Sequence, residues 1–143
     1  MQLNNTEHRL AGYWPARLEH TSGRALDAER GTLLVPSSRH REACDAIALP
    51  FIRVPARRDH GLPPLIVLFG GPGVAGIEAF GGYFFDHVER LSAICDVVTF
   101  DQRGCHGAMP NLVNPFPPDY DLREPLTRDS YLAAQRRSAT RLG

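Results

Sequence analysis

The stretch PLIVLFGGPG at residues 64–73 joins an unbroken apolar run to a glycine-rich turn. Because the run over 65–69 does not alternate with polar residues, it is typical of a strand buried on both faces of a sheet. A second stretch, DVVTFDQRG at 96–104, repeats the arrangement with an apolar run that ends in a polar turn. We therefore expect two strands, over 65–69 and 96–100, each followed by a sharp turn.

The segment between these strands has the pattern of a helix. Within 77–94, apolar residues recur at steps of three and four positions, which gives one apolar stripe along a helix. The stripe consists of Phe80, Phe84, Val88 and Leu91. A strand, a helix and a second strand in this order predict a right-handed crossover between parallel neighbours in one sheet.

Two earlier β-prone runs predict an antiparallel pair. They are GTLLVP at 31–36 and AIALPFIRVP at 46–55, and polar residues separate them. Pro50 lies inside the second run and has no N–H to donate, so we expect a bent or edge strand there. The predicted sheet is therefore mixed, with an antiparallel pair first and a parallel crossover after it.

The remaining segments lack a clear β pattern. Residues 1–30 are polar and Arg-rich, and the spacing of their few large apolar residues predicts an irregular or partly helical lead-in. Glycines and prolines from 104 to 126 predict a long surface loop. We divide the chain into a lead-in over 1–30, a main α/β part over 31–126 and a C-terminal helix over 127–143.

The composition excludes some partners. The chain of 143 residues carries 16 basic and 16 acidic side chains, so no basic surface for nucleic acid or an anionic membrane is expected. The first residues hold no apolar core of a secretory signal, and no apolar stretch is long enough to span a membrane, which predicts a cytoplasmic protein. The three cysteines lack metal-ligand spacing and predict neither a metal site nor a disulfide scaffold.

The turn Gly70-Gly71-Pro72-Gly73 has the composition of an anion site. Without Cβ atoms at three of its positions, the chain can turn sharply and leave backbone N–H groups open to a ligand. One chemistry that uses such a turn is an oxyanion hole, in which N–H groups stabilise the tetrahedral intermediate of acyl transfer. We favour this interpretation.

Two other chemistries use a similar turn. Gly71 and Gly76 have phosphate-loop spacing, but Ile77 and Glu78 replace the required Lys and Ser or Thr. Residues 71–76, GPGVAG, match GxGxxG between a strand and a helix, as in a dinucleotide site. Glu78 would repel a pyrophosphate and two strands precede the motif, so this alternative is weaker but stays open.

The motifs GTLLVP, PLIVLFGGPG and DVVTFDQRG together resemble the prolyl iminopeptidase and tripeptidyl aminopeptidase family of α/β-hydrolases, over about 29–112. The resemblance implies an α/β fold class, namely the N-terminal part of an α/β-hydrolase with an incomplete sheet. It assigns the oxyanion turn to Gly70, Gly71, Pro72 and Gly73. It also places a structural loop beside the site, formed by Asp101, Gln102, Arg103 and Gly104. We expect Asp101 and Arg103 to hold that loop by ion pairing and hydrogen bonds.

The sequence departs from the family pattern at two places. Phe69 stands where the family usually has His, which a backbone donor tolerates. CHGA at 105–108 replaces an ending with small residues and Ser, so that His106 stands where Gly would relieve a tight turn. We interpret His106 and His87 as surface histidines without a catalytic role.

A hydrolase of this family needs a Ser in a GxSxG elbow, followed by an acid and a His. No GxSxG occurs in the sequence, so no catalytic residue and no cofactor is assigned, and the chain alone is expected to be inactive. The family's nucleophile strand would pair beside 65–69, whose free edge invites association. We expect the N-terminal fragment of a serine aminopeptidase acting on a peptide or a small ester or amide. The alternative is a non-catalytic module that binds a dinucleotide at the turn or a protein partner at the open edge.

Overall fold

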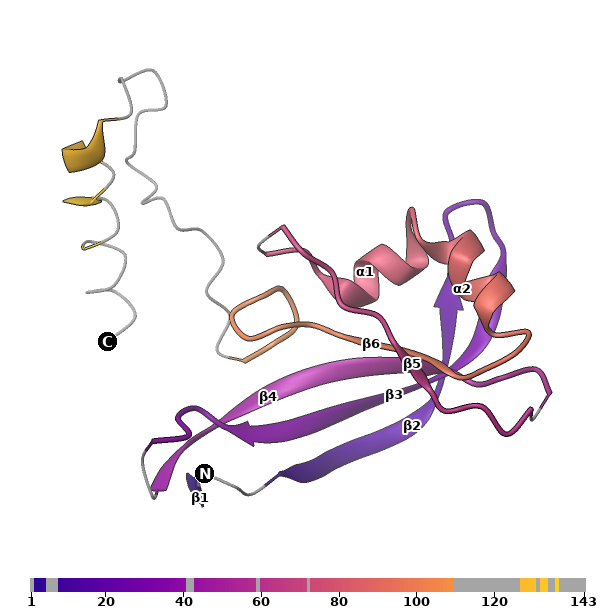
Figure 1. Ribbon diagram of the computed structural model, residues 1–143, viewed down its shortest axis with the longest axis horizontal. Coiled ribbons are helices and arrows are strands. Elements are labelled where there is room, and N and C mark those ends of the chain that lie inside the picture. The colour runs from indigo at the N-terminus through magenta and orange to yellow at the C-terminus, as the bar shows by residue number, and fades with distance from the viewer. Residues whose placement is uncertain are drawn as a thin grey trace. The chain divides into compact units, whose positions relative to one another are not determined.

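The computed structural model of the chain contains two compact units, 1–111 and 112–143. The described residues are 2–4, 8–40, 43–58, 60–71, 73–109, 127–130, 132–133 and 136, with the backbone alone at 2–4 and 43. The first unit contains the sheet and the helices α1 and α2 labelled in Figure 1. In the second unit, 128–130, 132–133 and 136 are helical, and the rest of the predicted terminal helix lies outside the described residues. The same holds for 110–126 of the predicted loop.

The N-terminal segment is a long β-hairpin. β2 (Arg9–Glu19) and β3 (Ala25–Pro36) pair in antiparallel fashion along nearly their whole length. A tight turn with Gly23 at a φ of +83° reverses the chain between them. The prediction of an irregular or partly helical lead-in over 1–30 is therefore wrong, because pairing with β3 overrides the helical spacing of a few apolar residues.

β4 (Ala43–Val54) pairs with β3 in antiparallel fashion, which confirms the predicted pair, and β1 (Gln2–Asn4) pairs with the first residues of β4. Of the predicted bent or edge strand at Pro50, the edge alternative is wrong, because β4 lies between β3 and β6 (Val97–Phe100). In an antiparallel pair, opposed residues exchange N–H and C=O bonds. Pro50 accepts from the N–H of Asp101 at 3.0 Å but cannot return the bond, so the pairing with β6 ends there.

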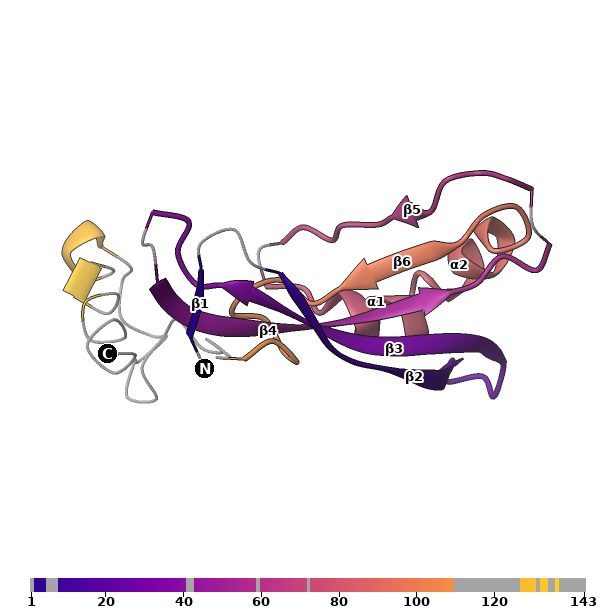
Figure 2. The ribbon, with the colours of Figure 1, turned by 90° about the horizontal axis from the view of Figure 1, so that it is seen from below.

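β5 (Leu65–Ile66) pairs in parallel with β6, as the predicted crossover requires. The strand order β2-β3-β4-β6-β5 places β5 at one edge and β2 at the other, as Figure 2 shows. The prediction of a long strand over 65–69 buried on both faces is wrong. The strand is short, and Ile66 and Leu68 are 60% and 64% exposed, whereas Val67 and Phe69 pack against the core. Because side chains alternate between faces along an extended segment, one face is covered and the other is open.

Two short helices, α1 (Gly76–Gly81) and α2 (Phe85–Leu91), replace the single helix predicted over 77–94. Gly82 follows α1 with a ψ of −124°, far from helical values, and glycine is a poor helix former. The break turns the second helix relative to the first. As a result Phe85, outside the predicted apolar stripe, is buried in the core.

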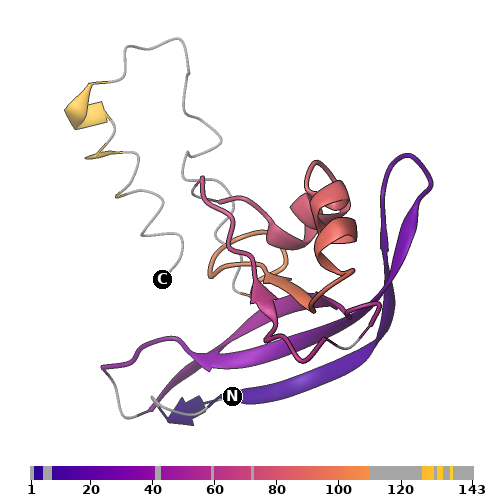
Figure 3. The same ribbon diagram turned by 45° about the vertical axis from the view of Figure 1, so that its right-hand side comes forward.

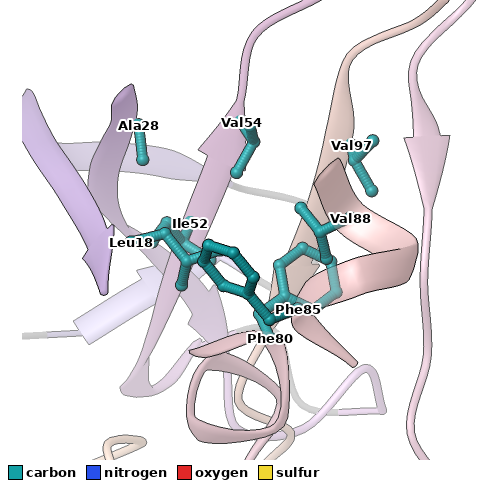
Figure 4. Packing of buried hydrophobic residues seen from close by; sticks show 8 residues of the cluster. All are labelled: Leu18, Ala28, Ile52, Val54, Phe80, Phe85, Val88 and Val97. Carbon is teal, nitrogen blue, oxygen red and sulfur yellow. The ribbon is translucent and has the colours of Figure 1, made fainter. Parts of the chain in front are cut away.

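The main hydrophobic core lies between the sheet and the two helices (Figure 4). Its buried members are Leu18, Ala28, Ile52, Val54, Phe80, Phe85, Val88 and Val97. The tip of the β2–β3 hairpin bends toward α2, as Figure 3 shows, and Arg24 in the tip forms ion pairs with Asp86 and Glu89. Truncating a large buried ring in such a core costs about 3–5 kcal/mol. The core therefore fixes the strands and helices from which the two polar turns project.

Candidate functional site

The turns that follow β5 and β6 lie side by side, because the carboxyl ends of neighbouring parallel strands lie at the same end of a sheet. Just before the turns, Thr99 Oγ1 donates to the carbonyl of Val67 at 2.9 Å. Gln102 Nε2 donates to the carbonyl of Phe69 at 2.7 Å and so joins the turns themselves. The structure thus brings together the two segments that the sequence predicts for the site, 70–73 and 101–104.

The turn after β5 presents backbone donors to solvent. Gly70, Gly71 and Gly73 are exposed, and Pro72 lies outside the described residues. Gly73 has a φ of +93°, a left-handed conformation that favours glycine. Among the hydrogen bonds of the described residues, none is donated by these three glycines. Their N–H groups are open to an external acceptor, as an oxyanion site requires.

Asp101 is a buried carboxylate at the end of β6 and is 2% exposed. Its Oδ1 accepts from the N–H of Ile77 at 3.1 Å, and its Oδ2 accepts from the N–H of Gly107 at 3.1 Å. The side chain therefore joins the first turn of α1 to the far end of its own loop. The loop is held by hydrogen bonds, as expected, but neither Asp101 nor Arg103 is among the ion pairs of the described residues.

Arg103 instead holds the loop against the end of β3. Its guanidinium donates to the carbonyls of Pro36 at 2.9 Å and Ser37 at 3.0 Å. Gly104 follows with a φ of +76°. His106 has a φ of +30°, in the left-handed region that favours glycine, and such a conformation costs a non-glycine residue about 1 kcal/mol or more. A Gly at this position would relieve that strain.

Phe69 anchors the start of the glycine turn on α1 and the residues after it. Its ring packs edge-on against Phe80, Tyr83 and Phe84, with ring centroids 5.8, 6.0 and 5.3 Å away. Edge-to-face pairs of this kind add about 0.5–1.5 kcal/mol each to the effect of area burial. Packing of the Phe69 ring thus fixes the position of the residue immediately before Gly70.

Gly76 lets α1 begin against the end of β6. A Cβ atom at this position would lie 2.6 Å from the carbonyl oxygen of Phe100 and 2.7 Å from Thr99 Oγ1. Both distances are shorter than a carbon atom tolerates, so a larger residue would push the helix away from the strand. The last glycine of the sequence motif therefore has a packing role in this fold.

A cleft of about 580 Å³ lies beside the turn after β6. Its charged lining residues come from the sheet, α1 and the turn, and include Arg17, Arg30, Glu78 and Asp101. The glycines of the turn after β5 are not among its lining residues. The cleft thus lies on the side of the turn after β6.

A shifted pKa occurs at the opposite end of β6. Asp96 Oδ1 accepts from the N–H of Ala56 at 2.7 Å, and Oδ2 pairs with the Arg53 guanidinium at 2.6 Å. The Ala56 N–H and, to a smaller extent, Arg53 hold the pKa of Asp96 below its ordinary value. This carboxylate stabilises the junction of β4 and β6 and takes no part in the pair of turns.

In the part of the chain that the structure describes, no group of three or more His, Cys, Asp or Glu side chains is arranged to hold a metal ion. None of the described helices is long and apolar enough to cross a membrane. The three cysteines, all in the described part, form no disulfide.

Sequence reasoning missed the contacts that hold the two turns in place. It grouped Gln102 with a structural loop but did not foresee its bond to Phe69, which depends on the register of β5 and β6. It expected Asp101 to bond within its loop but not to reach Ile77 in α1. An acidic residue directly after a strand, on the side where a helix begins, is the signal that could have indicated this bond.

No family model matches the chain. The chain is 40% identical over 80 residues to the serine protease Hip1 of Mycobacterium tuberculosis, and equally to Hip1 of Mycobacterium bovis. The matched stretch is 56% of this chain and 15% of each relative, so the chain spans less than a sixth of the length of these relatives. This similarity supports a hydrolase-like segment.

A search of solved structures found the homoserine O-acetyltransferase of Staphylococcus aureus. The match covers 96% of this chain and 36% of that chain, with 18% sequence identity and a TM-score of 0.30. A score this low does not establish a common fold. The strand order itself shows a mixed sheet, and two short helices pack with it in the unit 1–111.

Proposed function

We propose that this chain is the N-terminal part of a serine hydrolase of the aminopeptidase type, and that its glycine turn supplies oxyanion donors. The observation that carries the proposal is the joined pair of turns, in which the open N–H groups of Gly70, Gly71 and Gly73 adjoin a loop held by Asp101 and Gln102. The similarity to a serine protease supports the same class. One oxyanion donor contributes about 2.7–4 kcal/mol of transition-state stabilisation. The substrate would be a peptide or a small ester or amide.

The nucleophile would come from a further strand added beside β5. The side of β5 away from β6 is the edge of the sheet, and Leu65, Ile66 and Leu68 in this segment are exposed. A parallel strand at this edge would end next to the glycine turn, where a Ser in a GxSxG elbow would face the open N–H groups. Because these 143 residues contain no GxSxG, we expect hydrolysis only when further sequence supplies that strand.

A dinucleotide at the same turn is the weaker proposal. A pyrophosphate binds open N–H groups at a helix N-terminus and is repelled by carboxylates there. In α1 the N–H of Ile77 is already bonded to Asp101 at 3.1 Å, and Glu78 adds a second negative charge in the same turn. These two carboxylates favour an oxyanion formed transiently at 70–73 over a bound phosphate at α1.

The test of the proposal begins with the coding DNA after Gly143, read in all frames for an apolar strand that ends in GxSxG. If such a frame exists, the joined protein is expected to hydrolyse aminoacyl anilides and to be labelled by a fluorophosphonate at the elbow Ser. Residues 1–143 alone, and the joined protein with that Ser replaced by Ala, are the matched controls and should do neither. Unrelated sequence after a stop, or a joined protein that is not labelled, would overturn the proposal.

A second candidate function is a binding module that pairs a protein strand along β5. The exposed side chains of Ile66 and Leu68, next to an unpaired strand edge, favour it. If this is correct, the chain of 143 residues forms a defined dimer or complex, which sedimentation velocity would detect, and Ile66→Lys abolishes it. Glu78→Lys, on α1 and away from that edge, is the control.

A further inference from the structure

We propose that Gln102 is a positioning residue that aims the N–H of Gly70 into the oxyanion site by holding the carbonyl of Phe69. This inference rests on the proposed function, since it assigns how the same turn is kept in its productive orientation. It starts from one contact, the hydrogen bond of 2.7 Å from Gln102 Nε2 to the Phe69 carbonyl oxygen.

Through the geometry of the peptide bond, this contact also sets the direction of the Gly70 N–H. The carbonyl of Phe69 and the N–H of Gly70 belong to one planar trans peptide unit, so the two bonds point in roughly opposite directions. Because Gln102 holds the carbonyl toward the turn after β6, the N–H of Gly70 points away from that turn. This is the direction of the free side of β5, where the nucleophile strand would add.

The peptide needs such a restraint because the glycines that follow do not provide one. Earlier in the segment, Val67 is held on both of its backbone groups, by the carbonyl of Val98 at 2.8 Å and by Thr99 Oγ1 at 2.9 Å. After Phe69, the described glycines of the turn donate no hydrogen bond, and glycine adopts either sign of φ at little cost. Within the described part of the chain, the Gln102 contact is therefore the last hydrogen bond that opposes a flip of the Phe69–Gly70 peptide.

A flipped peptide would present a carbonyl oxygen where the oxyanion forms. It would remove one donor and add a repulsive acceptor, and loss of a single donor lowers kcat by about 10²–10³-fold in hydrolases. If the flipped state is populated in Gln102→Met, kcat should fall by about 10-fold or more with little change in KM, because only the transition state is affected. If Gln102 had a merely structural role, Gln102→Met would change the free energy of unfolding but would not lower kcat at an unchanged KM.

The first arm of the test is an NMR experiment on the 143-residue chain and requires no enzymatic activity. We expect a scalar coupling across the hydrogen bond between the Gln102 side-chain nitrogen and the Phe69 carbonyl carbon. In Gln102→Met, the Gly70 amide nitrogen should shift and its signal should broaden by exchange, while Arg103→Met, in the same loop, should leave Gly70 unchanged. Gln102→Glu, which keeps the shape but replaces the donor by an acceptor, should perturb Gly70 at least as strongly.

The second arm measures kcat and KM of the joined hydrolase with the same variants, after fluorophosphonate labelling has shown its nucleophile. Absence of the coupling in the wild-type chain, or a Gly70 signal that is the same in Gln102→Met and wild type, overturns the positioning role whatever the enzyme does. A perturbed Gly70 signal with unchanged kcat overturns it as well. A joined protein that is never labelled overturns the proposed function. The NMR result would then still show whether Gln102 orients the Phe69–Gly70 peptide.

Discussion

The turn after β5 and the turn after β6 occupy equivalent places at the ends of neighbouring parallel strands, yet they are built in opposite ways. In the first, the described glycines donate no hydrogen bond and lie exposed. In the second, Asp101, Gln102 and Arg103 each bond backbone groups of another element. One turn is held so that the other can remain open, which is how a backbone donor site is preorganised without using its own donors.

The largest effect is expected from Asp101→Ala, which should break the held turn. It removes a buried carboxylate and leaves the N–H groups of Ile77 and Gly107 without their acceptor, at a cost of about 3 kcal/mol in the free energy of unfolding. Urea denaturation of wild type and variant measures it. Gly70→Ala, in the open turn where an added Cβ meets nothing within 4 Å, is the control and should change stability by less than about 0.5 kcal/mol.

Gly76→Ala is expected to have the next largest effect, because it separates α1 from the end of β6. Alanine normally favours a helix over glycine, but here its Cβ would meet Phe100 and Thr99 at 2.6 and 2.7 Å. Overpacking of this kind costs about 2 kcal/mol, so the free energy of unfolding should fall. A variant as stable as wild type in urea denaturation would show that α1 is not in close contact with β6.

Asp96→Asn sharpens the comparison by acting on β6 at the end away from both turns. The pKa of Asp96 is lowered in the folded state, so its stabilising contribution is present above the ordinary carboxyl pKa of about 3.9 and is lost as the pH falls through the lowered folded value. At pH 7 the variant should be less stable by about 1 kcal/mol. The difference from wild type should shrink toward zero below about pH 4. A constant difference from pH 7 to pH 2 would contradict this account.

The smallest effect is expected from Arg103→Met, which keeps much of the side chain and removes the bonds to Pro36 and Ser37. Arg103 and Ser37 are exposed, so the Ser37 carbonyl can bond water instead, whereas Pro36 is buried. The loss of stability should therefore be about 0.5–1 kcal/mol. Thermal unfolding of the variant beside Arg103→Lys, which keeps the charge but not the two-pronged guanidinium, shows whether the charge alone holds the loop. A loss as large as that of Asp101→Ala would mean that the loop is held from β3 rather than from its buried carboxylate.

The sequence predicts the mixed sheet and the parallel pairing of β5 with β6, because apolar runs between turns are strong local signals. It misjudges the elements whose state depends on distant partners. The lead-in becomes a hairpin through pairing with β3, Pro50 is tolerated inside the sheet because β6 ends beside it, and Gly82 divides the helix. For the site, the glycines are visible in the sequence, but the bond from Gln102 to Phe69 depends on strand register and could not be predicted locally.

The chain after β6 forms hydrogen bonds with the same side of β4 at two places. The backbone N–H of Asp101 donates to the carbonyl of Pro50 at 3.0 Å. The backbones of Met109 and Ala48 then exchange two N–H···O=C hydrogen bonds of 3.0 and 2.9 Å. Residues 102–108 are thus an excursion whose two ends are fixed two positions apart on the same strand. Because that closure is supplied by β4, a longer excursion would add only a slowly growing entropic cost and would leave the strand register intact. A related chain could therefore lengthen this excursion after Gln102 and Arg103, beside the glycine turn, without rebuilding the sheet.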